Sequence, residues 1–301
     1  MRAVWSFWTP PFRAQHRDRW VSSRQHLLSW ILSVETARRH YPDTALVTDR
    51  EGADLLVGDL GLPFAEVSTA LDGLRGEDLD WWVHGKLQAY ALQSRPFVHL
   101  DYDVYLWERL PPRLEWAPVF AQNPEGVDIG CYEPDDCEAA IVRMGEGSIP
   151  PEWKWYRETP GQVAACCGIV GGCDTQLLRH YANTALGIIR SKANGEAFAA
   201  LPNKGIHNML FEQYLLCAVA AYHGSEVEFL FESFGEALSD EAAARVGYTH
   251  LMASAKSNPG VADRLERRVA RDHRDLYQRA VRIAALRGED RGAAAAGHSR
   301  M

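Results

Sequence analysis

The most constraining feature of the sequence is an apolar run that contains two acids, Phe97–Leu106, with Asp101 and Asp103 inside it. Apolar residues on both sides of the acids predict a strand buried on both faces, at or near the edge of a parallel sheet. Because residues two apart on an extended chain point to the same side, the two carboxylates are expected to converge. Such a pair suits Mg²⁺ or Mn²⁺ shared with substrate phosphates. The alternative is an Asp-x-Asp in an ordinary loop, but a buried acid pair is costly without a cation beside it.

The composition excludes several classes of function. The chain has 301 residues, of which 47% are hydrophobic, and this is enough for a large core. A net charge of −8 and a pI near 5.8 argue against a nucleic-acid surface or an anionic membrane surface. No apolar run reaches the length of a membrane span, and Met1–Trp8 is too short for a signal-peptide core. We therefore predict a cytoplasmic protein that binds no nucleic acid and has no membrane span.

The six cysteines are expected to be free thiols in that compartment. Cys166, Cys167 and Cys173, with Cys131 and Cys137 upstream, could in principle gather around zinc. None of their spacings is a Cys-x-x-Cys, so the favoured interpretation is that they are small buried hydrophobic side chains.

Strand and helix patterns alternate along the N-terminal part of the chain. The expected order is strand Ala3–Trp8, a helix from Ser22 or Ser23 to about Tyr41, strand Ala45–Thr48, helix Gly52–Val57 and strand Pro63–Ser68. This alternation is typical of a parallel sheet with helices on its faces. The predicted fold class is therefore α/β, with a mixed, mainly parallel sheet flanked by helices.

The rest of the chain is expected to complete one catalytic domain over residues 1–286, followed by a disordered tail over 287–301. Further strands are expected over Trp116–Gln122, Val163–Gly172, Glu226–Phe231 and Val246–Met252. The expected helices run from Asp80 to Gln93, from Asp174 to Arg190, over Ile206–Ala221 and, as one charged helix, over about 259–286. A mobile loop is expected over Leu71–Asp80 and an irregular insertion over about 123–160, which could form a lid or an acceptor platform.

Several residues in these elements are candidates for binding. Gly85 lies inside a predicted helix, which suggests close approach by another chain or a ligand. The adjacent Lys86 could reach a phosphate, although a solvated surface lysine is the alternative. The glycines of Val163–Gly172 would let a ligand approach the main chain. Glu212 and Gln213 lie among apolar residues of a helix, so they must find partners or line a cavity.

Three separated motifs resemble those of the GT-A glycosyltransferases, closest in pattern to the glycogenin-like branch that uses nucleotide sugars. His99–Asp103 resembles the family's Asp-x-Asp. Phe211–Gln213 resembles an Asp-Gln or Glu-Gln pair on a helix that follows a glycine-containing strand, here Cys167–Val170. His250–Lys256 resembles a His-x-x-Gly-x-x-Lys near the end of the catalytic domain. The motifs occur in the family's order over residues 3 to about 256, which implies a GT-A (Rossmann-like) fold in a divergent, bacterial-type member.

The chain also departs from the family pattern. Ala253 stands where the pattern has glycine, Ser257 and Asn258 replace the usual Pro-Trp, and Cys167 sits where an asparagine often precedes the glycine. These departures leave the implied metal and diphosphate roles intact and bear on the sugar, the acceptor and the stereochemistry. They favour an unusual acceptor over glycogen priming.

The resemblance implies a metal site and a donor site. Asp101 and Asp103 would hold Mn²⁺ or Mg²⁺, which stabilises the diphosphate that leaves. His250, as a neutral imidazole, would be a third metal ligand, and Lys256 would place a positive charge on the same diphosphate.

The remaining site residues also follow from the resemblance. The turn after Trp8 and the region of Asp49 would hold the nucleoside, and Glu212 and Gln213 would lie near the anomeric carbon. In an inverting enzyme Glu212 could deprotonate the acceptor, and in a retaining enzyme Gln213 could support a front-face attack. The full set of predicted donor-binding residues is Trp8, Asp49, Lys86, Gly168 and Lys256.

The predicted function is therefore that of a metal-dependent, hexosyltransferase-type enzyme. It would move a sugar from a nucleotide-diphosphate sugar, with a UDP-sugar favoured, to an unknown acceptor that could be a small molecule, a glycan or a peptide. A sugar nucleotidyltransferase also needs an acid pair, but Thr9–Arg13 is not the Gly-rich, basic loop that usually follows its first strand. A non-catalytic nucleotide-sugar-binding protein would have little use for the two acids, His250 and Lys256 together.

Overall fold

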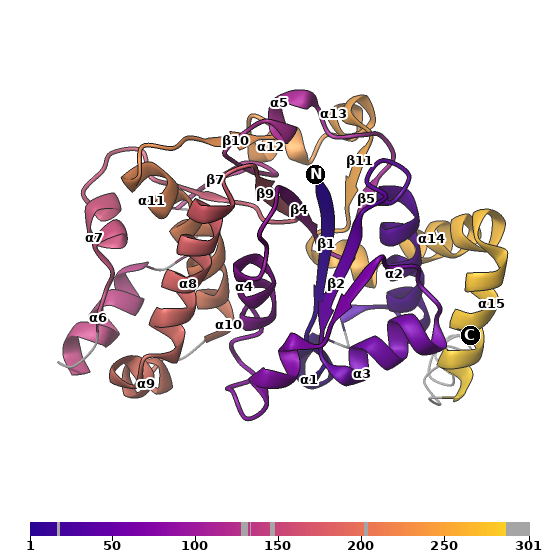
Figure 1. Ribbon diagram of the computed structural model, residues 1–301, viewed down its shortest axis with the longest axis horizontal. Coiled ribbons are helices and arrows are strands. Elements are labelled where there is room, and N and C mark those ends of the chain that lie inside the picture. The colour runs from indigo at the N-terminus through magenta and orange to yellow at the C-terminus, as the bar shows by residue number, and fades with distance from the viewer. Residues whose placement is uncertain (17–18, 128–131, 133, 145–147, 202–203, 287–301) are drawn as a thin grey trace, which may run out of the picture.

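A seven-stranded sheet forms the centre of the computed structural model, in the order β10-β6-β9-β4-β1-β2-β3 (Figure 1). The structure describes residues 1–16, 19–127, 132, 134–144, 148–201 and 204–286. The strands of this sheet are β1 (Arg2–Phe7), β2 (Thr44–Thr48), β3 (Glu66–Ser68), β4 (Phe97–Leu100), β6 (Val119–Ala121), β9 (Ile169–Gly172) and β10 (Val227–Phe229). β9 runs antiparallel to β4 and β6, and the other pairings are parallel. The predicted mixed, mainly parallel sheet flanked by helices is confirmed.

The helices extend over most of the remaining chain. The longer ones are α2 (Ser23–Ala37), α4 (His84–Ala91), α6 (Pro134–Met144), α7 (Pro151–Arg157), α8 (Thr175–Arg190), α9 (Lys192–Ala199), α11 (Leu215–Tyr222), α14 (Pro259–Asp272) and α15 (Arg274–Leu286). Short ones are α1 (Thr9–Pro11), α3 (Arg50–Ala53), α5 (Pro112–Glu115), α10 (Lys204–Met209), α12 (Phe234–Ala237) and α13 (Asp240–Val246), with π-helical turns over Phe12–His16, Asp54–Asp59 and Leu210–Tyr214. Among the described helices, none has both the length and the apolar character needed to cross a bilayer.

Alternate side chains of β1 enter two cores, one on each face of the sheet. Trp5 and Phe7 pack in the core that includes α2, α14 and α15, whereas Val4 belongs to the core that includes α4, α8 and α11. Figure 1 shows these two groups of helices on opposite sides of β1 and β2. Because successive side chains of a strand point to opposite faces, a sheet covered on both sides requires apolar residues at nearly every position.

The single strand expected over Phe97–Leu106 is in fact two strands. β4 ends at Leu100, and β5 (Val104–Leu106) pairs antiparallel with β11 (Tyr248–His250) in a separate two-stranded sheet. Between them the chain turns, and the Val104 N–H donates to the Asp101 carbonyl at 2.9 Å. The two acids are therefore brought together by a turn, not by an extended chain. β4 is an interior strand, and the acids follow its carboxyl end.

The single strand expected over Val163–Gly172 is also divided. β8 (Val163–Ala165) pairs with β7 (Pro124–Gly126), and only β9 joins the central sheet. The glycines at the end of β9 make room for neighbouring strands, not for a ligand. A Cβ atom on Gly171 would lie 2.0 Å from the Phe97 carbonyl oxygen, and one on Gly172 would lie 2.0 Å from that of Pro118.

The helix expected from Asp80 begins later, at His84. Asn208, from α10, satisfies the backbone ahead of this helix: its side chain accepts from the Val83 N–H at 3.0 Å and donates to the Asp80 carbonyl at 2.7 Å. The preceding loop also contains a 3₁₀ helix, Ala70–Leu74. A contact between distant segments thus replaces the local cap that Asp80 would have supplied.

The segment 123–160, expected to be irregular apart from a helix from Asp135 or Asp136 to Met144, has more regular structure than that. It contains β7, α6 and α7, and α7 begins with Pro151 in its first turn, a position where proline favours a helix start. The charged C-terminal segment is also different from the single helix expected, because it breaks at His273 into α14 and α15. The break lets both helices pack on α2. The predicted tail, 287–301, lies outside the described residues.

We predict that Gly171→Ala destabilises the protein by roughly 1–3 kcal/mol or more, because the new methyl group would overlap the backbone of β4. The matched control is Gly187→Ala in α8, where a Cβ atom would meet nothing within 4 Å. That change should stabilise the helix by about 0.5–1 kcal/mol. Urea unfolding of the three proteins measures both effects, and a Gly171→Ala protein as stable as the original would contradict this packing.

Candidate active site

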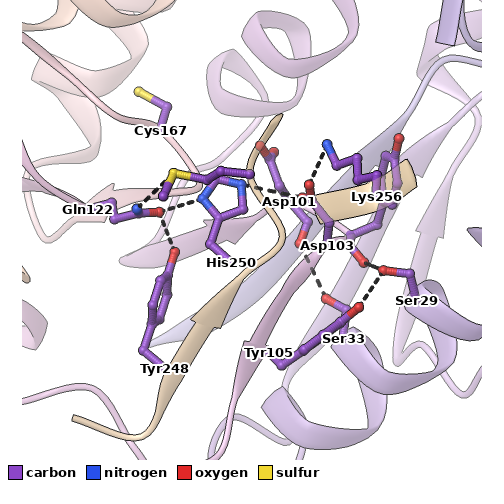
Figure 2. Close-up of polar contacts among 12 residues, drawn as sticks. Ser29, Ser33, Asp101, Asp103, Tyr105, Gln122, Cys167, Tyr248, His250 and Lys256 are labelled. Carbon is purple, nitrogen blue, oxygen red and sulfur yellow. Dashed lines mark hydrogen bonds and ion pairs between the residues drawn. The ribbon is translucent and has the colours of Figure 1, made fainter. Parts of the chain in front are cut away.

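The three predicted metal ligands lie together beyond the carboxyl end of β4 (Figure 2). Asp101, Asp103 and His250 each offer a ligand atom, and these atoms all lie within 4.8 Å of one another. His250 comes from a distant part of the chain and reaches the acids because β11 pairs His250 with Val104. We call the segment Asp101–Asp103 the acid turn.

Two serines of α2, Ser29 and Ser33, contact the backbone carbonyls of the acid turn (Figure 2). The Ser29 hydroxyl donates to the Tyr102 carbonyl at 2.9 Å and lies 2.8 Å from the Tyr105 hydroxyl. The Ser33 hydroxyl lies 3.4 Å from the Asp101 carbonyl. Both serines are fully buried, so these bonds satisfy polar groups that would otherwise be costly. They fix the backbone from which the two carboxylates project.

The tautomer of His250 follows from its hydrogen bond with Gln122. The Gln122 Oε1 atom lies 2.8 Å from His250 Nδ1 and also accepts from the Tyr248 hydroxyl at 2.6 Å. Because an amide oxygen only accepts, Nδ1 carries the proton and Nε2 has a free lone pair. Burial lowers the pKa of His250, so the imidazole is neutral.

That lone pair points toward the acids. His250 Nε2 lies 3.6 Å from the Asp103 Oδ1 atom, with no proton between them. A lone pair that faces a carboxylate is stabilised by a cation between them, and a neutral histidine held through its other nitrogen is the usual form of a metal ligand. The arrangement fits a divalent metal on Asp101, Asp103 and His250.

Gly168 makes room for this histidine. A Cβ atom at Gly168 would lie 2.4 Å from the Gln122 Oε1 atom and 2.5 Å from His250 Nδ1. The backbone of Gly168 also accepts from the Asp101 N–H at 3.0 Å. Any larger residue would therefore displace the pair that sets the tautomer.

Each acid of the turn is paired with a lysine. Lys86 Nζ lies 2.8 Å from Asp101 Oδ1, and Lys256 Nζ lies 2.5 Å from Asp103 Oδ2. Burial raises the pKa of Asp101 to about 6, even though Lys86 lowers it. Burial also acts to raise the pKa of Asp103, but Lys256 and His250 hold it below its usual value. Both acids are therefore ionised at neutral pH.

Glu212 is joined to the same network through Lys86. Its Oε1 atom lies 2.7 Å from Lys86 Nζ and accepts from the Tyr90 hydroxyl at 2.8 Å. Glu212 is 1% exposed. Burial lowers the pKa of Lys86, but Asp101 and Glu212 outweigh it and hold that pKa above its usual value. The carboxylate is thus paired with a buried cation and is not a free base.

Gln213 points elsewhere. Its Oε1 atom lies 2.6 Å from the Tyr132 hydroxyl, which lies 2.5 Å from the Glu125 carboxylate. Neither Glu212 nor Gln213 is among the described residues that line the cavity beside the acid turn.

A cavity of about 170 Å³ opens in front of the acid turn. Half of the sequence-predicted site residues line it, namely Trp8, Lys86, Asp101, Asp103 and Lys256. Trp8 also borders a second cavity, of about 450 Å³, together with Asp49. Trp8, in the turn after β1, therefore forms a wall that the two cavities share.

Asp49 has a structural task at that turn. Its Oδ2 atom accepts from the Thr9 N–H at 2.7 Å and from the Thr9 hydroxyl at 2.8 Å, while Oδ1 accepts from the Gly52 N–H at 2.8 Å. Asp49 therefore caps α3 and ties it to the turn after Trp8. The close approach expected at Gly85 is made by the same turn, since a Cβ atom there would lie 2.9 Å from that of Trp8.

Sequence reasoning missed the residues that support the ligands. Gln122 carried a usable signal, because it ends the predicted strand Trp116–Gln122, and polar residues at the carboxyl ends of parallel strands meet on one side of a sheet. Tyr90, Ser29 and Ser33 carried none. They lie inside helices, and their partners become visible only when the helices are packed.

The fold and the site define a class: a mixed α/β protein with a candidate divalent-metal site beyond the carboxyl ends of its strands. The chain belongs to a family described as a family of unknown function (DUF6734), whose model matches residues 1–283. No curated protein matches the chain.

The chain also resembles solved structures at a distance. A crystal structure of an active-site mutant of LgtC matches with 11% identity and a TM-score of 0.41, covering 83% of this chain and 86% of that one. The galactosyltransferase LgtC in complex with donor and acceptor sugar analogues also matches with 11% identity and a TM-score of 0.41, covering 88% and 96%. Similarity at this level is too low to transfer an activity or a residue role.

We predict that Mn²⁺ binds the acid turn and that Asp103→Asn lowers its affinity at least about 100-fold, because a direct ligand is lost. Gln122→Leu removes the partner of His250 Nδ1 and should lower the affinity by about 10–100-fold. The matched control, Asp263→Asn, changes an exposed acid of α14 and should leave the affinity unchanged.

Calorimetric titration of the four proteins measures these affinities. Equal Mn²⁺ affinity in Asp103→Asn and Asp263→Asn would exclude the acid turn as the binding site.

Proposed function

We propose that this protein is a metal-dependent glycosyltransferase of the GT-A type, which transfers a sugar from a nucleotide-diphosphate sugar to an acceptor. The observation that carries the proposal is the convergence of Asp101, Asp103 and the free lone pair of His250, with a lysine on each side. When a nucleoside diphosphate leaves the sugar, negative charge develops on its phosphates, and a metal and lysine ammonium groups would stabilise that charge. A UDP-sugar is the donor that we propose, with Mn²⁺ or Mg²⁺ as the metal.

The charges of the site favour joint binding of a metal and a diphosphate. The site has three carboxylates (Asp101, Asp103 and Glu212) and two ammonium groups (Lys86 and Lys256), which leaves one negative charge when all are ionised. A divalent cation would reverse that sign and attract an anionic donor. The metal, when bound, supplies Lewis-acid stabilisation of the leaving diphosphate.

The two lysines would have different tasks. Lys256 lies in a 3₁₀ helix, Ala253–Ser257, and lines the cavity beside Asp103. With Asp103 engaged by a metal, the Lys256 ammonium would be free to turn to the donor's phosphates. Lys86 is held from two sides by Asp101 and Glu212, so it would stay in place and orient the Asp101 carboxylate.

The structure favours a positioning role for Glu212. Because its carboxylate already binds Lys86 and Tyr90, we propose that Glu212 fixes Lys86 and, through it, Asp101. The nucleoside would lie against Trp8, the wall that the two cavities share, on a turn that Asp49 holds in shape.

The test is the release of UDP from a panel of UDP-sugars with Mn²⁺ and with EDTA. We expect metal-dependent release that falls about 10²–10³-fold in Lys256→Gln, because one electrostatic stabiliser of the leaving group is removed. Asp103→Asn should abolish release, and the Asp263→Asn control should retain it.

Two results would contradict the proposal. Full activity in EDTA would exclude the metal. Formation of pyrophosphate from a nucleoside triphosphate and a sugar phosphate, without release of UDP from UDP-sugars, would show a nucleotidyltransferase.

A further inference from the structure

A second group of potential metal ligands lies outside the candidate active site. Glu152 in α7, His180 in α8 and His223, directly after α11, each offer a ligand atom, and these atoms lie within 4.8 Å of one another. We call these three residues the Glu152 cluster. It joins three helices, one of them from the insertion.

The Glu152 cluster and the acid turn lie toward opposite ends of the strands of the central sheet. α8 starts just after Gly172, and Gly172 pairs with Phe97, the first residue of β4. The acid turn follows the last residue of β4, Leu100. His180 lies in the second turn of α8, on the side of the sheet where β4 begins. The cluster therefore does not belong to the site already described.

The distances within the cluster suit a tetrahedral metal. His180 Nε2 lies 2.7 Å and His223 Nε2 lies 3.7 Å from the same oxygen, Glu152 Oε1. Metal–ligand bonds of about 2.0–2.2 Å at tetrahedral angles separate the ligand atoms by roughly 3.4 Å. The two imidazole rings are perpendicular, with centroids 5.0 Å apart, so their nitrogens approach the carboxylate from different directions. To reach this separation, the first distance would lengthen by about 0.7 Å and the second would shorten by about 0.3 Å.

The charges of the cluster also favour a cation. Glu152 is 5% exposed, and no described lysine or arginine forms an ion pair with it. The two imidazoles are its described partners, and His180 Nε2 lies within hydrogen-bond distance of the carboxylate. A neutral imidazole can donate a hydrogen bond there but supplies no positive charge. The side chains of His180 and His223 are 47% and 42% exposed, so a metal can enter from solvent, with a fourth position open.

We propose that Glu152, His180 and His223 form a Zn²⁺ site that fixes the insertion helix α7 to α8 and α11. Two imidazole nitrogens and one carboxylate oxygen are a ligand set typical of zinc, whereas the oxygen-rich acid turn suits Mn²⁺ or Mg²⁺. The two sites therefore differ in the metal that their ligands prefer as well as in their position. This inference does not depend on the proposed glycosyltransferase activity.

The test uses Zn²⁺ and Co²⁺ titration of the metal-free, full-length chain. His180→Asn with His223→Asn should raise the Zn²⁺ dissociation constant at least about 100-fold and remove the visible Co²⁺ absorption of a tetrahedral site. The matched control is His40→Asn, a partly buried histidine whose Nε2 atom contacts the Trp107 carbonyl, and it should bind Zn²⁺ like the original protein. Mn²⁺ affinity should be the same in all three.

Two outcomes would overturn the site. One is an unchanged Zn²⁺ affinity in the double variant. The other is a thiolate charge-transfer band in the Co²⁺ spectrum, which would place the metal on a cysteine such as the exposed Cys173. Glu152→Gln provides a second variant that retains the shape of the side chain, and it too must weaken Zn²⁺ binding. Circular dichroism shows whether each variant is folded.

Discussion

The paired charges around Lys86 are the constraint on which the candidate site depends. A buried ammonium must be compensated, and Lys86 contacts Asp101 after β4, Glu212 in the π-helical turn and the Cys167 carbonyl ahead of β9. One side chain in the first turn of α4 thus links three segments that are far apart in the sequence. Removing Lys86 would leave the carboxylates of Asp101 and Glu212 without the cation that they share.

Strand pairings between distant parts of the chain place the remaining site residues, Gly168, Gln122 and His250. β9 runs against β4 and β6, and it brings Gly168 close to Gln122 and His250. β11 places His250 beside the acid turn by pairing with β5, outside the central sheet. The candidate metal ligands are therefore held by two sheets and by serines of α2. Small changes in the packing of these elements would shift the ligand atoms.

The sequence predicts the features of the fold and the site that depend on short stretches of residues, but not those that depend on contacts between distant residues. The alternation of strands and helices over residues 3–68 is sufficient for the fold class, and the acids of the apolar run Phe97–Leu106 point to a metal. The turn at Asp101–Asp103 was missed because apolar residues continue on both sides of it. The start of α4 was missed because Asn208, a distant residue, satisfies its backbone. The same holds for Gln122: its bond to His250 joins positions far apart in the chain.

The central claim is that one metal ion is shared by Asp101, Asp103 and His250. The most direct test is a crystal structure of the protein grown with Mn²⁺ and UDP, with anomalous diffraction data to locate manganese. The account predicts one anomalous peak within about 2.3 Å of both carboxylates and of His250 Nε2, with the diphosphate of UDP on the same ion and Lys256 turned toward it. A fully loaded crystal with manganese elsewhere, or with Nδ1 of His250 facing the ion, would contradict it.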